Sequence, residues 1–184
     1  TALTAEENFN GSFGGDAEAA PDAKKYGRYG VSSKSWYAWW RHLDRFDVTE
    51  EPNEPNRFGW IVEIDPQDAS STPKKRTALG RMKHEGAFVH VADDGRVVVY
   101  MGDDQVNEYA YKFVSSDNWK SLLARGKDPL DHGTLFVAQF DEDDLRLLEV
   151  LAGHAATGIR WLREAVALLP IAGLPASPHL WSLD

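Results

Sequence analysis

The sequence contains no cysteine, and its 20 basic residues are outnumbered by 29 acidic ones, which gives a formal net charge of -9. Without cysteine the chain can form neither a disulfide framework nor a thiolate metal site. The deficit of positive charge argues against a nucleic-acid partner, because polyanions are bound mainly by clustered Lys and Arg. The excess of carboxylates instead favours multivalent cations as partners.

Long apolar runs are also absent. The most apolar stretch, AVALLPIAGLPA, is interrupted by Pro170, Gly173 and Pro175, whereas a membrane span needs roughly 20 apolar residues in a row. We therefore expect no membrane partner. The chain opens at Thr1 with no basic-then-apolar leader, and we expect it to be a fragment of a longer protein.

What the sequence does contain is enough apolar and aromatic material for one ordinary core. Hydrophobic residues make up 42% of the 184 positions, with seven Trp, six Tyr and eight Phe. A chain of this length and composition is expected to fold as a globular domain. Its oligomeric state is left open.

Short runs of β-branched and aromatic residues, each bounded by Gly, Pro, Asn or Asp, predict a mainly β protein. ADDGR predicts a tight hairpin between two of these runs, because Asp94 and Gly95 tolerate positive φ. No long helical segment separates the runs, so an antiparallel meander is favoured over a parallel sheet. Barrel, sandwich and propeller blade all remain open at this point. The five predicted strands are residues 57–65, 86–92, 96–102, 107–114 and 133–141.

The two ends of the chain differ from this pattern. The first 30 residues, rich in Gly, Ala and Asp, are typical of a loop. SSKSWYAWWRHL predicts either a short helix capped by Ser32 or Ser33, or an aromatic core floor. From residue 144 the strand signals stop and apolar residues recur at helical intervals, so residues 144–184 are expected to be helical or poorly anchored.

Acidic residues recur where predicted strands begin and end. Glu85 directly precedes the run GAFVHV, Asp103 and Asp104 close the run before them, and Glu6 and Glu7 form a pair near the start. In a meander these points gather at the rim of the sheet, where sites are commonly built. Several carboxylates there would suit a hard cation such as Ca²⁺. The alternative is that they are ordinary solvated turn residues.

Three segments together indicate a family. LTAEENFNGSFG, the long stretch from NRFGWIVEID through KHEGAFVHVADDGRVVVYMGDD to FVSSDNW, and LDHGTLFVAQFDED resemble, in that order, the bacterial PhoX alkaline phosphatases. The resemblance covers residues 1–143 and implies part of a β-propeller, with residues 144–184 as a divergent tail. It also implies an exported, periplasmic or extracellular enzyme that hydrolyses phosphate monoesters with Ca²⁺ and Fe³⁺.

The resemblance implies that the glutamate of KHEGA is a metal ligand at the propeller's central site and a catalytic residue, which here would be Glu85. GDD would bring Asp103 or Asp104 to the same metals, and EEN would bring Glu6 or Glu7. The basic neighbours Lys83 and Arg81 either contact phosphate or are solvated.

The chain also departs from the family pattern. Ala5 stands where the family usually has a cysteine, and no Arg-Pro-Glu triplet occurs to supply a phosphate-binding arginine. We therefore expect the chain alone to be inactive although it derives from an enzyme. The alternative function is a non-catalytic β-propeller scaffold or binding module.

Overall fold

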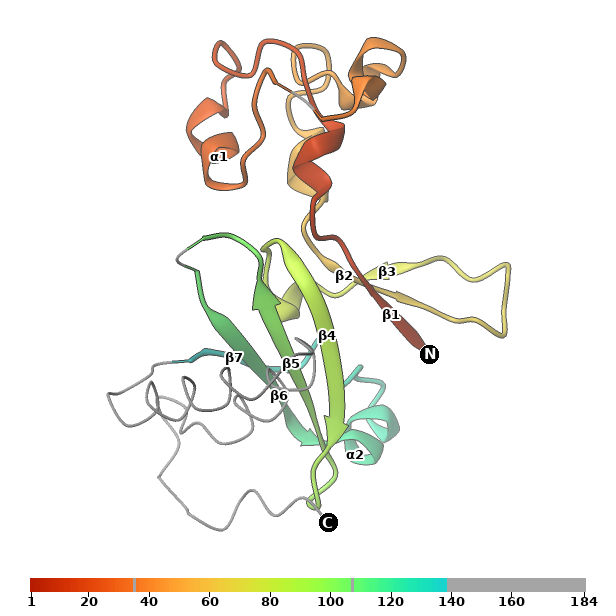
Figure 1. Cartoon of the computed structure of the whole chain (residues 1–184). Helices are drawn as coiled ribbons and strands as arrows, with labels where there is room; N and C mark the ends of the chain where they lie inside the picture. Colours follow the sequence, from red (N-terminus) through yellow and green to blue (C-terminus); the bar gives the residue numbers. More distant parts are fainter. Residues whose placement is uncertain (35, 107, 139–184) are drawn as a thin grey trace, which may run out of the picture. The chain divides into compact units, whose positions relative to one another are not determined.

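The computed structural model describes residues 1–34, 36–106 and 108–138. The chain divides into two units. Unit 1 is Thr1–Ala87 with Gly102–Glu108, and unit 2 is Phe88–Met101 with the residues from 109 onward. Each unit is described by itself (Figure 1).

The described chain contains short strands and short helices, with most of the helices between β1 and β2. The strands are β1 Ala2–Ala5, β2 Ile61–Ile64, β3 Lys74–Lys75, β4 His84–Val91, β5 Arg96–Asp103, β6 Ala110–Asn118 and β7 Gly133–Val137. The α-helices are α1 Ala23–Arg28 and α2 Trp119–Ala124. The 3₁₀ helices are η1 Phe9–Ser12, η2 Ala38–Arg41, η3 Asp44–Phe46, η4 Glu54–Arg57 and η5 Thr77–Leu79.

A small antiparallel sheet, ordered β1-β2-β3, forms the regular part of unit 1 (Figure 1). β1 pairs with β2 along its whole length, with Ala5 opposite Ile61. Ile61 is fully buried, and burying such a side chain contributes about 1.5–3 kcal/mol. The pairing places the residues that follow β1 next to the residues that precede β2.

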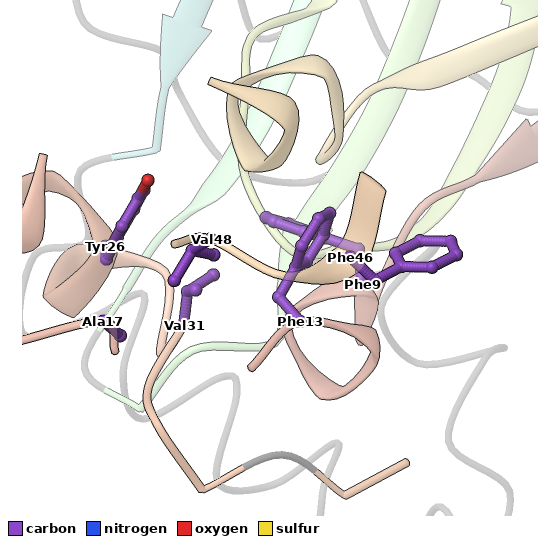
Figure 2. Close-up of a cluster of buried hydrophobic side chains, with 7 residues drawn as sticks. All are labelled: Phe9, Phe13, Ala17, Tyr26, Val31, Phe46 and Val48. Atoms are coloured by element: carbon purple, nitrogen blue, oxygen red, sulfur yellow. The ribbon is translucent and has the colours of Figure 1, made fainter. Parts of the chain in front are cut away.

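The core of unit 1 is built from loops and 3₁₀ turns rather than from long elements. Aromatic rings hold it together: the Phe13 ring meets those of Phe46 and Phe58 edge to face, at centroid distances of 5.5 Å and 5.3 Å. Such contacts add about 0.5–1.5 kcal/mol beyond area burial. Figure 2 shows the buried cluster, whose members are Phe9, Phe13, Ala17, Tyr26, Val31, Phe46 and Val48.

The second sheet is a four-stranded meander ordered β4-β5-β6-β7 (Figure 1). β5 lies between β4 and β6 and carries the apolar run. Val97, Val98 and Val99 are buried in succession, so both faces of β5 are covered. β6 and β7 pair antiparallel, with Phe113 opposite Leu135. Gly133 lies so close to Phe113 that a Cβ there would stand 2.3 Å from the ring.

The predicted hairpin between β4 and β5 is confirmed. Residues 92–95 form the turn, in which Gly95 has φ of +79° and its N–H donates to the Ala92 carbonyl at 2.7 Å. The Asn118 side chain packs against Gly95 and donates to the Asp94 carbonyl at 3.0 Å. The same side chain caps α2 by accepting from the Lys120 N–H. The turn is thereby fixed to the end of β6.

The mainly antiparallel β architecture is confirmed, but the predicted membership of the meander was wrong in one place. The strand predicted at 57–65 does not join the meander, because β2 pairs with β1 and β3 instead. The strands predicted at 86–92 and 96–102 are β4 and β5, within two residues at each end.

Two predictions for the first 50 residues were also wrong. The opening segment is not all loop, since it holds β1 and α1. The predicted helix around residues 32–43 is reduced to η2, and its aromatics do not form a core floor: Trp36 and Trp39 are 63% and 51% exposed. Trp40 does pack against the buried cluster.

The predicted tail at 144–184 lies outside the described residues. Within the described part of the chain, no helix is both long and apolar enough to cross a membrane.

Candidate functional site

The acidic residues singled out in the sequence gather in unit 1. Glu85 is the second residue of β4, and Asp103 ends β5 with Asp104 directly after it. Glu6 and Glu7 follow β1. The backbone N–H of Asp104 donates to the Lys83 carbonyl at 3.0 Å, so the start of β4 and the end of β5 lie at the same end of the sheet. The predicted shared rim for Glu85 and the Asp103–Asp104 pair is confirmed.

Glu7 interacts electrostatically with two of the other carboxylates, those of Asp104 and Glu85. Glu7 is half-buried, whereas Asp104 and Glu85 are exposed. Burial raises the pKa of Glu7, and a hydrogen bond with Asp104 and the negative charges of Asp104 and Glu85 raise it further. Asn8 opposes this by donating to Glu7 Oε1 at 2.6 Å. Asp104 and Glu85 therefore both repel the ionised form of Glu7. Glu7, Asp104 and Glu85 are hereafter called the carboxylate cluster.

Asp103 has a different environment. Its side chain is fully buried. Oδ1 accepts from the backbone N–H groups of Lys83 and Gln105, both at 3.2 Å. Oδ2 accepts from the guanidinium of Arg28 at 3.1 Å. Both oxygens thus tie chain segments together beside the carboxylate cluster.

Glu6 is likewise bound within the fold. Its Oε2 accepts from the backbone N–H groups of Gly59 and Trp60, both at 3.1 Å. Its Oε1 accepts from Lys75 Nζ at 2.7 Å. These bonds join the end of β1 to the residues directly before β2, so Glu6 has a clear structural role.

The basic neighbours of Glu85 are neither solvated nor turned outward for phosphate. Lys83 is only 9% exposed and donates through Nζ to Gln105 at 2.8 Å. Arg81 donates to the carbonyls of Phe58 and Pro55 at 2.8 Å each. Its guanidinium also lies 3.8 Å from the centre of the Tyr29 ring.

Two further residues near these groups escaped the sequence analysis. Asn10 is buried, its Nδ2 donates to the Gly30 carbonyl at 3.3 Å, and its Oδ1 has no partner within the described part of the chain. A Cβ at Gly30 would lie 3.2 Å from Asn10 Nδ2 and 3.3 Å from Lys83 Nζ. Gly30 also has φ of +68°, so both space and backbone favour glycine there. The second residue is Arg28, whose partner Asp103 is 75 positions away in sequence.

The donor set determines which metals the cluster suits. Carboxylate oxygens are the ligands that hard cations such as Ca²⁺ prefer. Ala5, paired with Ile61 inside the β1–β2 sheet, offers no donor atom. Among the described residues no three His, Cys, Asp or Glu side chains form a group already arranged to hold a metal ion. The cluster therefore fits a partial oxygen site.

The fold and the cluster together define the class: a mainly antiparallel β protein with a candidate cation site at one end of its meander. The family model of alkaline phosphatase PhoX matches residues 1–169. The chain therefore belongs to the PhoX alkaline phosphatase family. The match continues past residue 143, the end that the sequence resemblance predicts. The division into residues 1–143 and 144–184 stays a prediction.

A solved structure supports the same assignment. The chain is similar to Pseudomonas fluorescens PhoX in complex with vanadate, a transition state analogue, with 51% sequence identity and a TM-score of 0.65. The similarity covers 76% of this chain but only 24% of that one. The chain thus spans about a quarter of the length of this relative. No curated protein matches it.

Proposed function

We propose that this chain supplies part of the metal site of a secreted phosphomonoesterase, with Glu7, Asp104 and Glu85 as Ca²⁺ ligands and Glu85 at the catalytic centre. The observation that carries the proposal is the convergence of the three carboxylates: the Asp104 N–H donates to the Lys83 carbonyl at 3.0 Å, which brings the end of β5 to the start of β4, and Glu7 shares a hydrogen bond with Asp104. Carboxylates that repel one another in the metal-free chain are stabilised when a cation binds between them.

The cluster alone suggests modest affinity. Ca²⁺ takes six to eight oxygen ligands, so three carboxylates leave positions to water. We expect a dissociation constant of about 10⁻⁴–10⁻³ M, the range of extracellular calcium modules. Such affinity is useful where calcium is plentiful, and the proposal includes a periplasmic or extracellular setting on the strength of the family resemblance.

The second sheet supports a propeller fold. β4, β5, β6 and β7 form one four-stranded antiparallel meander, which has the strand number of a propeller blade. We propose that this sheet is one blade and that the carboxylate cluster lies where the blade faces the propeller axis.

Phosphate ester hydrolysis is proposed from the family and from the relative that was solved with vanadate. When bound, cations would neutralise phosphoryl oxygens and activate the attacking group. The chain's own carboxylates would hold these cations in place. Fe³⁺ is proposed from the family alone. Ala5 stands where the family usually has a cysteine, and its methyl side chain offers no metal ligand.

The alternative, a scaffold or binding module without catalysis, has one specific observation in its favour. The cationic side chains near the cluster are already engaged: Arg81 and Lys83 by the fold, and Arg28 by Asp103. A phosphate-binding cation would therefore have to come from elsewhere. For this reason we expect little or no turnover by the 184-residue chain alone.

Calcium titration of the 184-residue chain tests the proposal. We expect weak binding by the unsubstituted chain and at least tenfold weaker binding by Glu85→Gln, because an amide oxygen carries no charge for the cation. Asp68→Asn is the control, since Asp68 is an acidic residue hydrogen-bonded to Ser70 in the loop after β2. Equal binding by Glu85→Gln and Asp68→Asn would contradict the proposal.

Activity is tested with p-nitrophenyl phosphate in the presence of Ca²⁺ and Fe³⁺. A longer protein containing this chain should turn the ester over, and Glu85→Gln should reduce its kcat by about 10²-fold or more, the cost of losing one preorganised charge-stabilising group. Undiminished turnover by that variant would favour the alternative function for this segment, a scaffold or binding module without catalysis.

A further inference from the structure

A salt bridge joins α1 to Asp103, the residue before the cluster member Asp104, and no role has been assigned to it so far. Arg28 is the last residue of α1. One of its terminal nitrogens, Nη2, lies 3.1 Å from Asp103 Oδ2 and 3.2 Å from Glu108 Oε2. Burial disfavours its charge, but the hydrogen bond to Asp103 and the charges of Glu108 and Asp103 outweigh this and raise the pKa of Arg28. Arg28 is therefore firmly held as a cation.

The carboxylate that Arg28 holds is a junction between two strands. Asp103 is buried and accepts from the N–H groups of Lys83 and Gln105, one before β4 and one after β5. The Asp104 N–H closes the junction from the other side by donating to the Lys83 carbonyl. This Lys83–Asp103–Asp104 junction fixes the two backbone segments that carry two members of the carboxylate cluster.

We propose that Arg28 is a positioning residue for the cation site: by neutralising and holding Asp103, it keeps Asp104 and Glu85 next to Glu7. Asp104 directly follows Asp103, and Glu85 lies two residues after Lys83. This inference rests on the proposed function, because it concerns how the same site is held together.

The physical reason is the number of negative charges in a small space. Removing Arg28 leaves the buried carboxylate of Asp103 uncompensated, close in sequence to Asp104. An uncompensated buried charge is costly, so the Asp103 side chain would move toward water. That movement weakens the hydrogen bonds from the Lys83 and Gln105 N–H groups and loosens the junction. Partners behind metal ligands typically change metal affinity by about 10–100-fold when they are removed.

The chain offers a matched control. Arg45 forms an ion pair with Glu54, another buried carboxylate of unit 1, and its guanidinium lies 5.2 Å from the centre of the Phe46 ring. Arg45→Ala therefore removes an arginine–carboxylate pair from the same unit, with Arg57 still paired to Glu54 at 3.2 Å. It leaves the junction untouched, so it reports what the mere loss of such a pair does to stability.

The experiment uses Tb³⁺ as the probe, with luminescence decay in H₂O and D₂O to count the waters on the bound ion. We expect Arg28→Ala to weaken Tb³⁺ binding about tenfold and to raise the number of bound waters. Arg28→Lys, which keeps the positive charge, should restore most of the affinity. Arg45→Ala should bind Tb³⁺ as the unsubstituted chain does. Equal affinity and hydration in Arg28→Ala and Arg45→Ala would overturn the positioning role.

A metal-independent measurement separates this inference from the proposed function. Amide exchange of Lys83 and Asp104, followed by NMR in the metal-free chain, should accelerate in Arg28→Ala but not in Arg45→Ala. Unchanged exchange in Arg28→Ala would overturn the inference even if Tb³⁺ binds. If the unsubstituted chain binds no Tb³⁺, the metal site itself is overturned, whereas faster exchange would still show that Arg28 orders the junction.

Discussion

Glu7→Gln should stabilise the metal-free chain while removing its ability to bind Ca²⁺. In the structure, burial and the acidic neighbours Asp104 and Glu85 raise the pKa of Glu7. The fold therefore disfavours the ionised form of Glu7 at neutral pH. Glutamine keeps an oxygen that accepts from Asn8, as Glu7 Oε1 does at 2.6 Å, so the substitution removes repulsion without removing that hydrogen bond.

The magnitude follows from the exposure of the partners. Asp104 and Glu85 are exposed, so water screens the repulsion, and interactions between exposed charges amount to at most about 1 kcal/mol. For a chain of this size that free energy corresponds to a rise in Tm of about 2–4 °C.

The pH dependence has a definite sign. Because the pKa of Glu7 is raised in the folded chain, the favourable contribution of its protonated form is present below the ordinary value of 4.5 and is lost as pH rises through the folded value. The gain from Glu7→Gln should therefore be near zero at pH 4 and complete at pH 7.

The assay is thermal unfolding with chelator at both pH values, followed by the same scans at pH 7 with 10 mM Ca²⁺. Calcium should raise the Tm of the unsubstituted chain but leave that of Glu7→Gln unchanged, because a ligand that binds only the folded state stabilises it. A Glu7→Gln chain that is less stable than the unsubstituted one at pH 7, or that is stabilised equally by calcium, would refute the reasoning.

Three further predictions concern the scaffold. Gly133→Ala should destabilise the chain by about 1–3 kcal/mol in urea unfolding, because its Cβ would meet the Phe113 ring at 2.3 Å. Gly27→Ala, inside α1 with nothing within 4 Å, should instead stabilise it by about 0.5–1 kcal/mol, and equal effects of the two substitutions would contradict the packing. Burial and the charge of Arg96 lower the pKa of Lys112 to about 8. The free energy of unfolding should therefore rise between pH 8 and 10.5 by at most about 3 kcal/mol. Lys112→Met should abolish this rise, and a rise that persists in Lys112→Met would contradict its assignment to Lys112. Glu6→Gln should lower Tm without changing calcium affinity, since Glu6 is bound to Gly59, Trp60 and Lys75, and a large loss of affinity would assign Glu6 to the metal site.

Local patterns were enough to predict the meander. β4 and β5 carry alternating or continuous β-branched residues, and the turn between them contains Gly95, whose φ is positive as the sequence predicted. The partner of β2 was not predictable in this way, because β1 is a four-residue strand without a clear alternation. Its pairing depends on residues far away in the sequence, since Ala2 lies opposite Ile64 and Ala5 opposite Ile61.

The candidate site was predicted as a set of acidic residues but not in its division of roles. Glu6 and Glu7 are adjacent and chemically alike, as are Asp103 and Asp104. Within each pair, one side chain turns to backbone N–H donors and the other to the cluster. Sequence cannot show which backbone N–H groups lack a partner, so it could not separate them. Arg28 was missed because nothing local marks a residue that acts through a carboxylate 75 positions away.

If Glu7, Asp104 and Glu85 form one cation site, calcium must change the titration of the Glu7 carboxyl group. A ¹³C-detected NMR titration of the 184-residue chain would follow that carboxyl carbon with chelator and again with 10 mM Ca²⁺. We expect a midpoint above the ordinary glutamate value without metal, and a clear downward shift when calcium is present. A midpoint that is ordinary and insensitive to calcium would contradict it.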